Sequence, residues 1–124
     1  MTINLDPEML KIYRANAKKR LLATYPQREK RRQKGLKLAH EAANLLRDKF
    51  NVTKVKIFGS VLISDCFTMW SDVDIAAWGI PDDKTFLAME MVRDLDQEIE
   101  VNLVDVNWCK SEILKAIEEK GIEI

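Results

Sequence analysis

The sequence has few of the residues that build metal clusters and disulfide frameworks. Its 124 residues include two cysteines, Cys66 and Cys109, and one histidine, His40. Neither cysteine belongs to a CxxC pair, so a zinc site and a disulfide scaffold are disfavoured and both thiols are expected to be reduced. No apolar run approaches the roughly 18 residues of a membrane span, and residues 1–8 lack the pattern of a secretory signal. We therefore expect a cytoplasmic protein with no membrane partner.

Net charge is also absent, but the balance hides a strong asymmetry along the chain. Residues 1–56 hold 15 Lys/Arg and 5 Asp/Glu, whereas residues 57–124 hold 5 Lys/Arg and 15 Asp/Glu. The two parts therefore differ from neutrality by +10 and −10. Such a division favours an anionic partner for the first part and cations for the second.

Proline and capping residues indicate helices in the first 50 residues. Asp6 can cap a helix that has Pro7 at its first position, and Pro26 is expected to end this helix after Tyr25. A second helix is predicted from about residue 27 to Phe50. Its first turns, residues 28–34, have no apolar face, so we expect them to project into solvent or to meet a partner.

The remaining residues alternate short strands with helices, which is typical of an α/β (α+β) protein. We predict a small mixed sheet of three to four strands flanked by helices, with an N-terminal helical extension. The expected division is a basic helical extension, 1–50, packed on a core, 51–124, within a single domain. The strands are expected at 55–58, 73–77, 99–106 and 122–124, and the helices at 82–95 and 107–121.

Two aspartates lie in the second predicted strand, shortly after a Gly-Ser turn. Asp72 and Asp74 are two residues apart, so they point to the same side of a strand about 7 Å from each other. Paired carboxylates are costly to bury without a cation, and a divalent metal is the natural partner. Gly59 lets the backbone approach a phosphate closely, and Ser60 adds a hydroxyl donor. The combination predicts a site for phosphate and Mg²⁺.

This pattern, Gly59-Ser60 followed by Ser71-Asp72-Val73-Asp74-Ile75, resembles the GS…DxD signature of nucleotidyltransferases related to DNA polymerase β. The resemblance covers about residues 50–124 and implies the nucleotidyltransferase fold. In size the chain is similar to minimal nucleotidyltransferases, a group that includes antitoxins encoded beside HEPN ribonuclease toxins.

The resemblance implies a magnesium-dependent enzyme that transfers AMP from ATP to a hydroxyl, most simply a tyrosine, of a partner HEPN toxin and so neutralises it. Gly59 and Ser60, together with Ser71, would bind the triphosphate of ATP. Asp72 and Asp74 would bind Mg²⁺ and carry the catalysis. The expected assembly is a hetero-oligomer with the toxin.

The sequence departs from this family in two places. Ile63-Ser64 stands where an Arg-Gly pair is common, and Asn102 stands where many members have a third aspartate. An amide can coordinate a metal but is a very poor base, so Glu100, on the same predicted face, is the candidate replacement. The alternative is a degenerate nucleotidyltransferase that neutralises its partner by binding alone, or one that transfers a nucleotide to a small molecule or RNA.

The aromatic and basic residues have two interpretations each. Trp70 and Trp78 flank the aspartates and can stack on a nucleobase, although packing in the core or at its rim is the simpler interpretation; Trp108 and Met89 are expected in the core. The basic region suits nucleic acid, but docking of an acidic protein partner is favoured. This region comprises Arg14, Lys18, Lys19, Arg20, Arg28, Lys30, Arg31, Arg32, Lys34 and Lys37.

Overall fold

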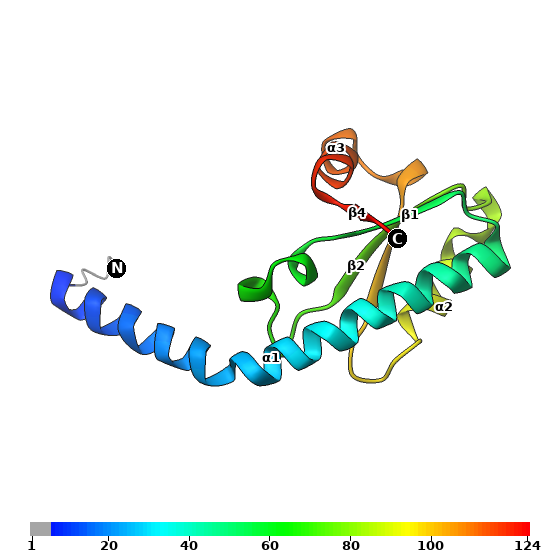
Figure 1. Cartoon of the computed structure of the whole chain (residues 1–124). Coiled ribbons are helices and arrows are strands. Elements are labelled where there is room, and N and C mark those ends of the chain that lie inside the picture. Colours follow the sequence, from blue (N-terminus) through cyan, green and yellow to red (C-terminus); the bar gives the residue numbers. More distant parts are fainter. Residues whose placement is uncertain (1–5) are drawn as a thin grey trace.

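The computed structural model describes residues 6–124, which form a mixed four-stranded sheet with helices on both faces (Figure 1). This confirms the expected α+β class. The helices are α1 (Pro7–Phe50), α2 (Thr85–Arg93) and α3 (Ser111–Lys120), and the strands are β1 (Lys54–Phe58), β2 (Val73–Trp78), β3 (Val101–Asp105) and β4 (Ile122–Glu123). Short 3-10 turns connect them, namely η1 (Ser60–Leu62), η2 (Ser64–Cys66), η3 (Asp82–Lys84) and η4 (Val106–Trp108).

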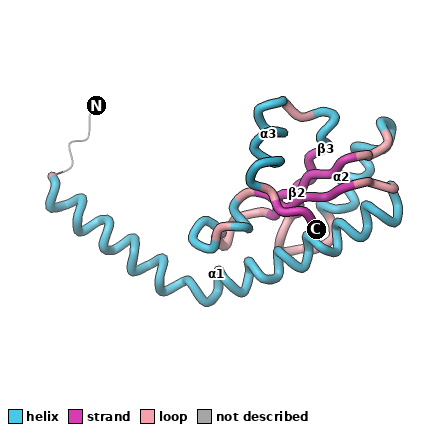
Figure 2. Tube along the Cα trace, turned by 45° about the horizontal axis from the view of Figure 1, so that its top comes forward, coloured by secondary structure: helices cyan, strands magenta, loops and turns pink. Residues whose placement is uncertain are grey.

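The strand order β3-β2-β1-β4 places the aspartate strand β2 in the middle of the sheet (Figure 2). β1 pairs antiparallel with both β2 and β4, and β2 pairs in parallel with β3 through the α2 crossover. Asp74 lies opposite Phe58 on one side and opposite Asn102 on the other. The end of β1 and the beginnings of β2 and β3 therefore meet at one end of the sheet.

The two faces of the sheet are buried by different helices. Val73, Ile75 and Ala77 belong to the main core, which also includes residues of α1 and α2 such as Leu46 and Val92. Ala76 alternates to the other face and packs in a smaller cluster, which includes Ile117 and Leu114 of α3. Because Asp74 and Asn102 have the same alternation as Ala76, they lie on the α3 side of the sheet.

The expected break at Pro26 is wrong, because α1 runs without interruption from Pro7 to Phe50. Figure 1 shows a bend in this helix, and proline is a common cause of such a bend. Arg28 supplies donors near the position that lacks a backbone N–H: its Nη2 donates to the carbonyl of Leu21 at 2.6 Å, and its Nε donates to Thr24 Oγ1 at 3.1 Å. These donors lie beside the turn in which Pro26 lacks the N–H that would bond the carbonyl of Leu22.

The expectation that residues 28–34 point into solvent is also wrong. Arg28 is 4 % exposed and Gly35 is buried, and both continue the stripe that includes Ala39, Ala42 and Leu46 in the core. A Cβ at Gly35 would lie 2.9 Å from Val73 Cγ2, so this glycine allows close contact between helix and sheet. Residues of α1 and of the strands belong to one hydrophobic core. The predicted division into an extension, 1–50, and a core, 51–124, stays a prediction.

Several apolar side chains expected in the core are exposed. Met89 and Trp108, both expected in the core, lie at the surface, and Phe86 and Ile113 are exposed as well. The two short helices bury few side chains: α2 buries Thr85, Ala88 and Val92, and α3 buries Ile117. Within residues 6–124, no helix combines the length and the apolar character needed to cross a membrane.

Candidate functional site

A row of polar side chains crosses the beginning of β2 and β3. Asn102 Nδ2 lies 3.4 Å from Asp72 Oδ2 and 3.4 Å from Asp74 Oδ1, so one amide donates to both carboxylates. Asp72 and Asp74 are half-buried, whereas Asn102 is exposed. The alternation of β2 and its parallel pairing with β3 bring these three side chains together, as the spacing of the two aspartates predicts.

Gly59 brings the loop after β1 against the same carboxylate. Its φ of +83° and ψ of −157° are a conformation that only glycine adopts readily. A Cβ at this position would lie 2.6 Å from Asp74 Oδ2. Ser60 follows as the first residue of η1. The Gly59 backbone and the two carboxylates thus lie together at one end of the sheet, and the phosphate-and-metal site there stays a prediction.

The environment of Asp74 disfavours its charged form. Partial burial raises the pKa of its carboxyl above the usual value, the amide of Asn102 acts in the opposite direction, and the neighbouring charge of Asp72 raises it further. A cation between the two carboxylates would offset both the burial and the repulsion.

The donor set fits a magnesium ion delivered with a nucleotide. Two carboxylates are the usual protein contribution to such an ion, with phosphate oxygens and water filling the other positions. Among residues 6–124 there is no group of three or more His, Cys, Asp and Glu side chains able to hold a metal. The amide of Asn102 is therefore the third polar group beside Asp72 and Asp74, and its carbonyl oxygen can face a metal after rotation of the amide.

Glu100 and Ser71, the other two predicted site residues, lie at the edge of this row. The carbonyl of Glu100 accepts from Val73 N–H at 3.0 Å, so Glu100 is next to the start of β2, with its side chain exposed. The Ser71 hydroxyl accepts from Thr68 N–H at 2.9 Å and also bonds the Thr68 hydroxyl. It therefore holds the loop before Asp72, and among residues 6–124 its hydroxyl bonds Thr68 rather than the carboxylates.

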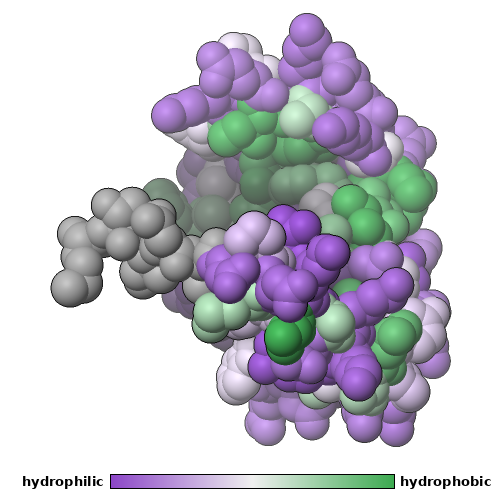
Figure 3. Space-filling view, turned by 90° about the vertical axis from the view of Figure 1, so that its left-hand side faces the viewer, coloured by the Kyte–Doolittle hydropathy of each residue, from purple (hydrophilic) through white to green (hydrophobic). Residues whose placement is uncertain are grey.

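A hollow lies beside Gly59, under α3. A cavity of about 380 Å³ is lined by Phe58, Gly59, Glu112, Ile113, Ala116, Ile117 and Lys120. Figure 3 looks onto this end of the molecule and shows hydrophobic surface in a recess between the upper and lower parts of the molecule. The exposed Ile113 is therefore part of the wall of this hollow beside the candidate site.

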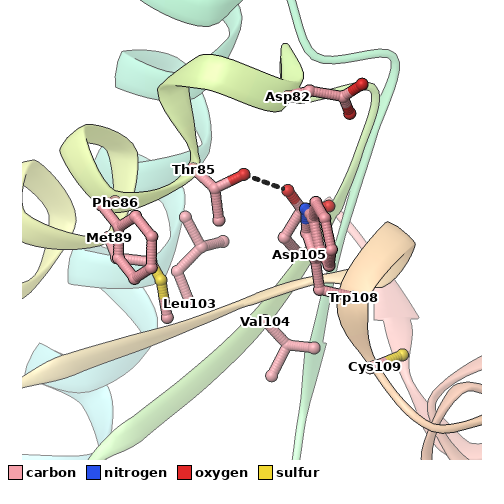
Figure 4. Close-up of a pocket in the computed structure, with 9 residues that line it drawn as sticks. All are labelled: Asp82, Thr85, Phe86, Met89, Leu103, Val104, Asp105, Trp108 and Cys109. Atoms are coloured by element: carbon pink, nitrogen blue, oxygen red, sulfur yellow. Dashed lines mark hydrogen bonds between the residues drawn. The ribbon is translucent and has the colours of Figure 1, made fainter.

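A second cavity, of about 430 Å³, lies at the opposite end of β3, beside Asp105 (Figure 4). Phe86 and Met89 line one side and Trp108 the other. Asp105 is 4 % exposed; it accepts from the Thr85 hydroxyl at 2.7 Å and from Asn107 N–H at 3.1 Å. This buried carboxylate has structural partners, and the register of β2 and β3 separates it from Asp74 by three residues, about 10 Å.

Arginines of α1 hold the loops around the site, a role that the sequence analysis missed. Arg31 donates to the carbonyls of Ser71, at 3.0 Å, and Glu98, at 3.2 Å. Arg32 donates to the carbonyl of Val61 in η1 at 2.7 Å. The signal was present in the sequence, because residues 28, 31, 32 and 35 continue the helical spacing of the buried alanines toward the N-terminus.

Trp70 and Trp78 have different surroundings. Trp78 is half-buried, with Lys54 Nζ lying 4.1 Å from the centre of its ring. Trp70, in the loop held by Ser71, is 90 % exposed, so the expectation that it packs in the core or at its rim is wrong.

Comparison with solved structures places this arrangement in a known fold. The chain superposes on a chain of the crystal structure of the toxin–antitoxin MntA–HepT with a TM-score of 0.52. The match covers 69 % of this chain and 68 % of that chain, at 18 % sequence identity. The chain has the nucleotidyltransferase fold. No family model and no curated protein matches the sequence.

In this nucleotidyltransferase fold the sheet presents Gly59, Asp72 and Asp74 at one end. The long α1 helix lies across the opposite face of the sheet from α3 (Figure 1). Its contribution to the site is indirect, through the arginines that bind the carbonyls of the loops.

Proposed function

We propose that this protein is an antitoxin of the minimal nucleotidyltransferase type, which transfers AMP from ATP to a tyrosine hydroxyl of a HEPN ribonuclease toxin. The main observation that supports this proposal is the close approach of the Gly59 loop to the carboxylate of Asp74, next to Asp72. The similarity to a chain of a toxin–antitoxin crystal structure supports the antitoxin role.

The residues of the site take distinct roles in this proposal. Gly59 and Ser60 bind the triphosphate, because a glycine backbone allows close approach and a serine hydroxyl donates to phosphate oxygen. Asp72 and Asp74 hold Mg²⁺, which neutralises the charge of the phosphates when bound. The apolar wall of Phe58, Ile113 and Ala116 beside Gly59 offers surface for the nucleobase.

The reaction forms one bond and breaks another. The tyrosine oxygen attacks the α-phosphorus of ATP, the bond between the α-phosphorus and the bridging oxygen breaks, and pyrophosphate leaves. The phenolic proton passes to a base. Glu100 is the candidate for this base, because its side chain is exposed directly before β3 and its carbonyl bonds Val73, the residue between the two aspartates.

The second candidate function is neutralisation by binding alone. Asn102 favours this alternative, because it places an amide, with no charge and no basicity, opposite Asp74. The two candidates share the fold and the partner, and they differ in whether the carboxylates are needed.

Labelling of the partner tests the transfer. The purified protein, Mg²⁺, ATP labelled in its α-phosphate and the product of the neighbouring gene are incubated together, and label on that product is expected. The double variant Asp72→Asn, Asp74→Asn should reduce labelling by at least about 100-fold, because the metal ligands lose their charge. The matched control, Asp82→Asn with Asp83→Asn, removes the same charge from exposed residues at the other end of the sheet and should label normally.

The same pair of variants separates the two candidate functions in cells that express the toxin. Transfer predicts that Asp72→Asn, Asp74→Asn loses protection while its complex with the partner persists. Protection by that variant equal to wild type, with no label on the partner, would establish neutralisation by binding and reject the transfer.

A further inference from the structure

The N-terminal part of α1 leaves the body of the protein. We call residues 7–25 the arm. It carries exposed apolar side chains that contact no core, including Ile12 at 62 %, Tyr13 at 67 % and Leu22 at 63 % exposure. Met9, Leu21 and Tyr25 are exposed as well. An isolated helix of this length has only marginal stability in water. The exposed apolar side chains of the arm indicate that another molecule covers it in an assembly.

The arm is also strongly basic. It contains five Lys/Arg residues and one acidic residue, Glu8, and all five cations are exposed. Within residues 6–124 none of these five cations takes part in an ion pair. The five are Lys11, Arg14, Lys18, Lys19 and Arg20. By contrast, the cations closer to the core, such as Arg32 and Lys34, pair with Glu29, Asp96 and Glu98.

Side chains at its base fix the arm relative to the candidate site. The buried Arg28 donates to Leu21 and Thr24 in the arm and, at 3.4 Å, to the carbonyl of Ser64 in η2. Glu29 accepts from the Ser64 hydroxyl at 3.1 Å. One guanidinium therefore joins the arm to the turn that follows the Gly59-Ser60 loop.

The arm extends on the side of the molecule where the candidate site opens. Figures 1 and 2 show it projecting beyond η1 and η2, away from the C-terminal end of α1. The segment of residues 63–70, which includes η2 and the start of the loop to β2, adds its own exposed apolar side chains, Ile63 at 56 %, Met69 at 47 % and Trp70 at 90 % exposure. A macromolecule that covers both the arm and this segment lies at the end of the sheet that carries the Gly59 loop and the carboxylates.

We propose that the arm and the segment of residues 63–70 form the docking surface for the acceptor protein, which presents to them an acidic surface with an apolar ridge. This inference rests on the proposed function, since it names the surface by which the partner of that reaction binds. Unpaired cations beside exposed aliphatic side chains complement such a surface, whereas RNA offers phosphates and bases but no aliphatic partner. A second copy in this position would obstruct the site that the acceptor has to reach.

Charge reversal in the arm tests the proposal. The full-length variant Arg14→Glu, Lys18→Glu is titrated calorimetrically with the product of the neighbouring gene at low and high salt. The control Lys49→Glu, Lys115→Glu makes the same change in charge at exposed positions away from the arm. We expect the arm variant to weaken Kd at least about tenfold at low salt and to show a smaller salt dependence. The control should stay within about twofold of wild type.

An apolar pair of variants makes the test independent of charge. Ile12→Ser should weaken binding about tenfold or more, as expected for an apolar contact at an interface. Leu87→Ser, an exposed leucine of α2, should have no such effect. Far-ultraviolet circular dichroism and Tm establish that each variant folds, because neither position belongs to the core.

Each remaining outcome overturns the proposal in a defined way. Equal Kd values for wild type and both arm variants reject the arm as the docking surface. Arm-dependent binding of a mixed-sequence 20-nucleotide RNA, with unchanged binding of the protein, assigns the arm to nucleic acid. Arm-dependent dimers of the chain alone, in sedimentation velocity, with unchanged binding of the protein, assign it to a second copy.

The result also separates this inference from the proposed function. Arm-dependent binding without transfer of label keeps the docking surface and rejects the enzyme. If the arm variants transfer label with the same KM for the acceptor protein as wild type, the proposed enzyme stands and the docking surface is rejected. Failure of wild type to bind the neighbouring gene product rejects both.

Discussion

Replacing Gly59 by alanine places a methyl group between the loop after β1 and the carboxylate of Asp74. The new Cβ would be 2.6 Å from Asp74 Oδ2. Carbon–oxygen contacts are comfortable from about 3.3 Å, so the carboxylate or the loop has to move by about 0.7 Å. The backbone at φ +83° and ψ −157° adds a further cost of about 1–3 kcal/mol for a residue with a side chain.

This displacement exceeds what a magnesium site tolerates, since metal–ligand distances vary by only about 0.2 Å. We therefore expect Gly59→Ala to lose both stability and ligand response. A cost of about 2 kcal/mol corresponds to a fall in Tm of about 6–10 °C for a chain of this size. For wild type, Mg·ATP at 100 times its Kd should stabilise the fold by about 2.7 kcal/mol and raise Tm by about 10 °C. The variant should show almost no such rise.

Gly79→Ala is the matched control for the backbone cost. Gly79 also has a positive φ, +91°, and its added Cβ would approach Thr53 at 3.2 Å, beyond the far end of β2 from the carboxylates. It should lower Tm to a similar degree and keep the full response to Mg·ATP, measured by differential scanning fluorimetry. A response in Gly59→Ala as large as that of Gly79→Ala would refute the link between this glycine and the metal ligands.

Two further predictions concern single carboxylates. Asp74→Asn should raise the Tm of the metal-free protein at pH 7. Burial raises the pKa of the Asp74 carboxyl in the folded state, so the charged carboxylate destabilises the fold at a pH above that pKa. This penalty disappears at a pH below the pKa that Asp74 has in the unfolded chain. The gain should therefore vanish at about pH 3, and a gain that persists there would contradict this explanation. Asp105→Ala should lower the free energy of unfolding in urea by about 2–4 kcal/mol, because it leaves the buried Thr85 hydroxyl unpaired, whereas removal of the exposed Asp94 should change it by under about 0.5 kcal/mol.

The sequence predicted the central elements well because their signals are local. Alternation and turn residues located β1, β2 and β3 to within two residues, and the period of two in β2 predicted that Asp72 and Asp74 share a face. Asp6 caps α1 as expected, accepting from Glu8 N–H at 3.1 Å, and Gly121 ends α3. These features depend on the residues themselves and their near neighbours.

The errors occurred where a distant contact overrides a local preference. Pro26 is a helix breaker by its own chemistry, but α1 continues through it, and the helix that follows it is held against the sheet by a buried stripe that begins at Arg28. The amphipathic pattern of α2 did not reveal that Phe86 and Met89 would line a cavity, because the buried residues of this helix are Thr85, Ala88 and Val92. Which side chains a short helix buries is set by packing between elements.

The basic half of the chain illustrates the same point with functional consequences. As a sequence it is one run of cations, for which a partner surface is the natural interpretation. The structure divides it by burial: Arg28, Arg31 and Arg32 bind carbonyls of the protein itself, and the arm cations have no such partners within residues 6–124. A charge reversal at Arg28, Arg31 or Arg32 should therefore lower stability, whereas under the proposal above a reversal in the arm should weaken association.

An uncharged side chain at position 102 has a physical advantage in this site. Its amide donates to Asp72 and Asp74 together, and a third carboxylate there would face one whose pKa is already raised by burial and by its neighbour. An asparagine thus reduces repulsion in the metal-free protein and also reduces the charge available to hold an ion. Two carboxylates bind Mg²⁺ weakly unless phosphate oxygens complete its shell. Under the proposed function, Mg²⁺ should therefore bind with ATP rather than before it, and detectable binding of Mg²⁺ alone at micromolar concentration would contradict this role for Asn102.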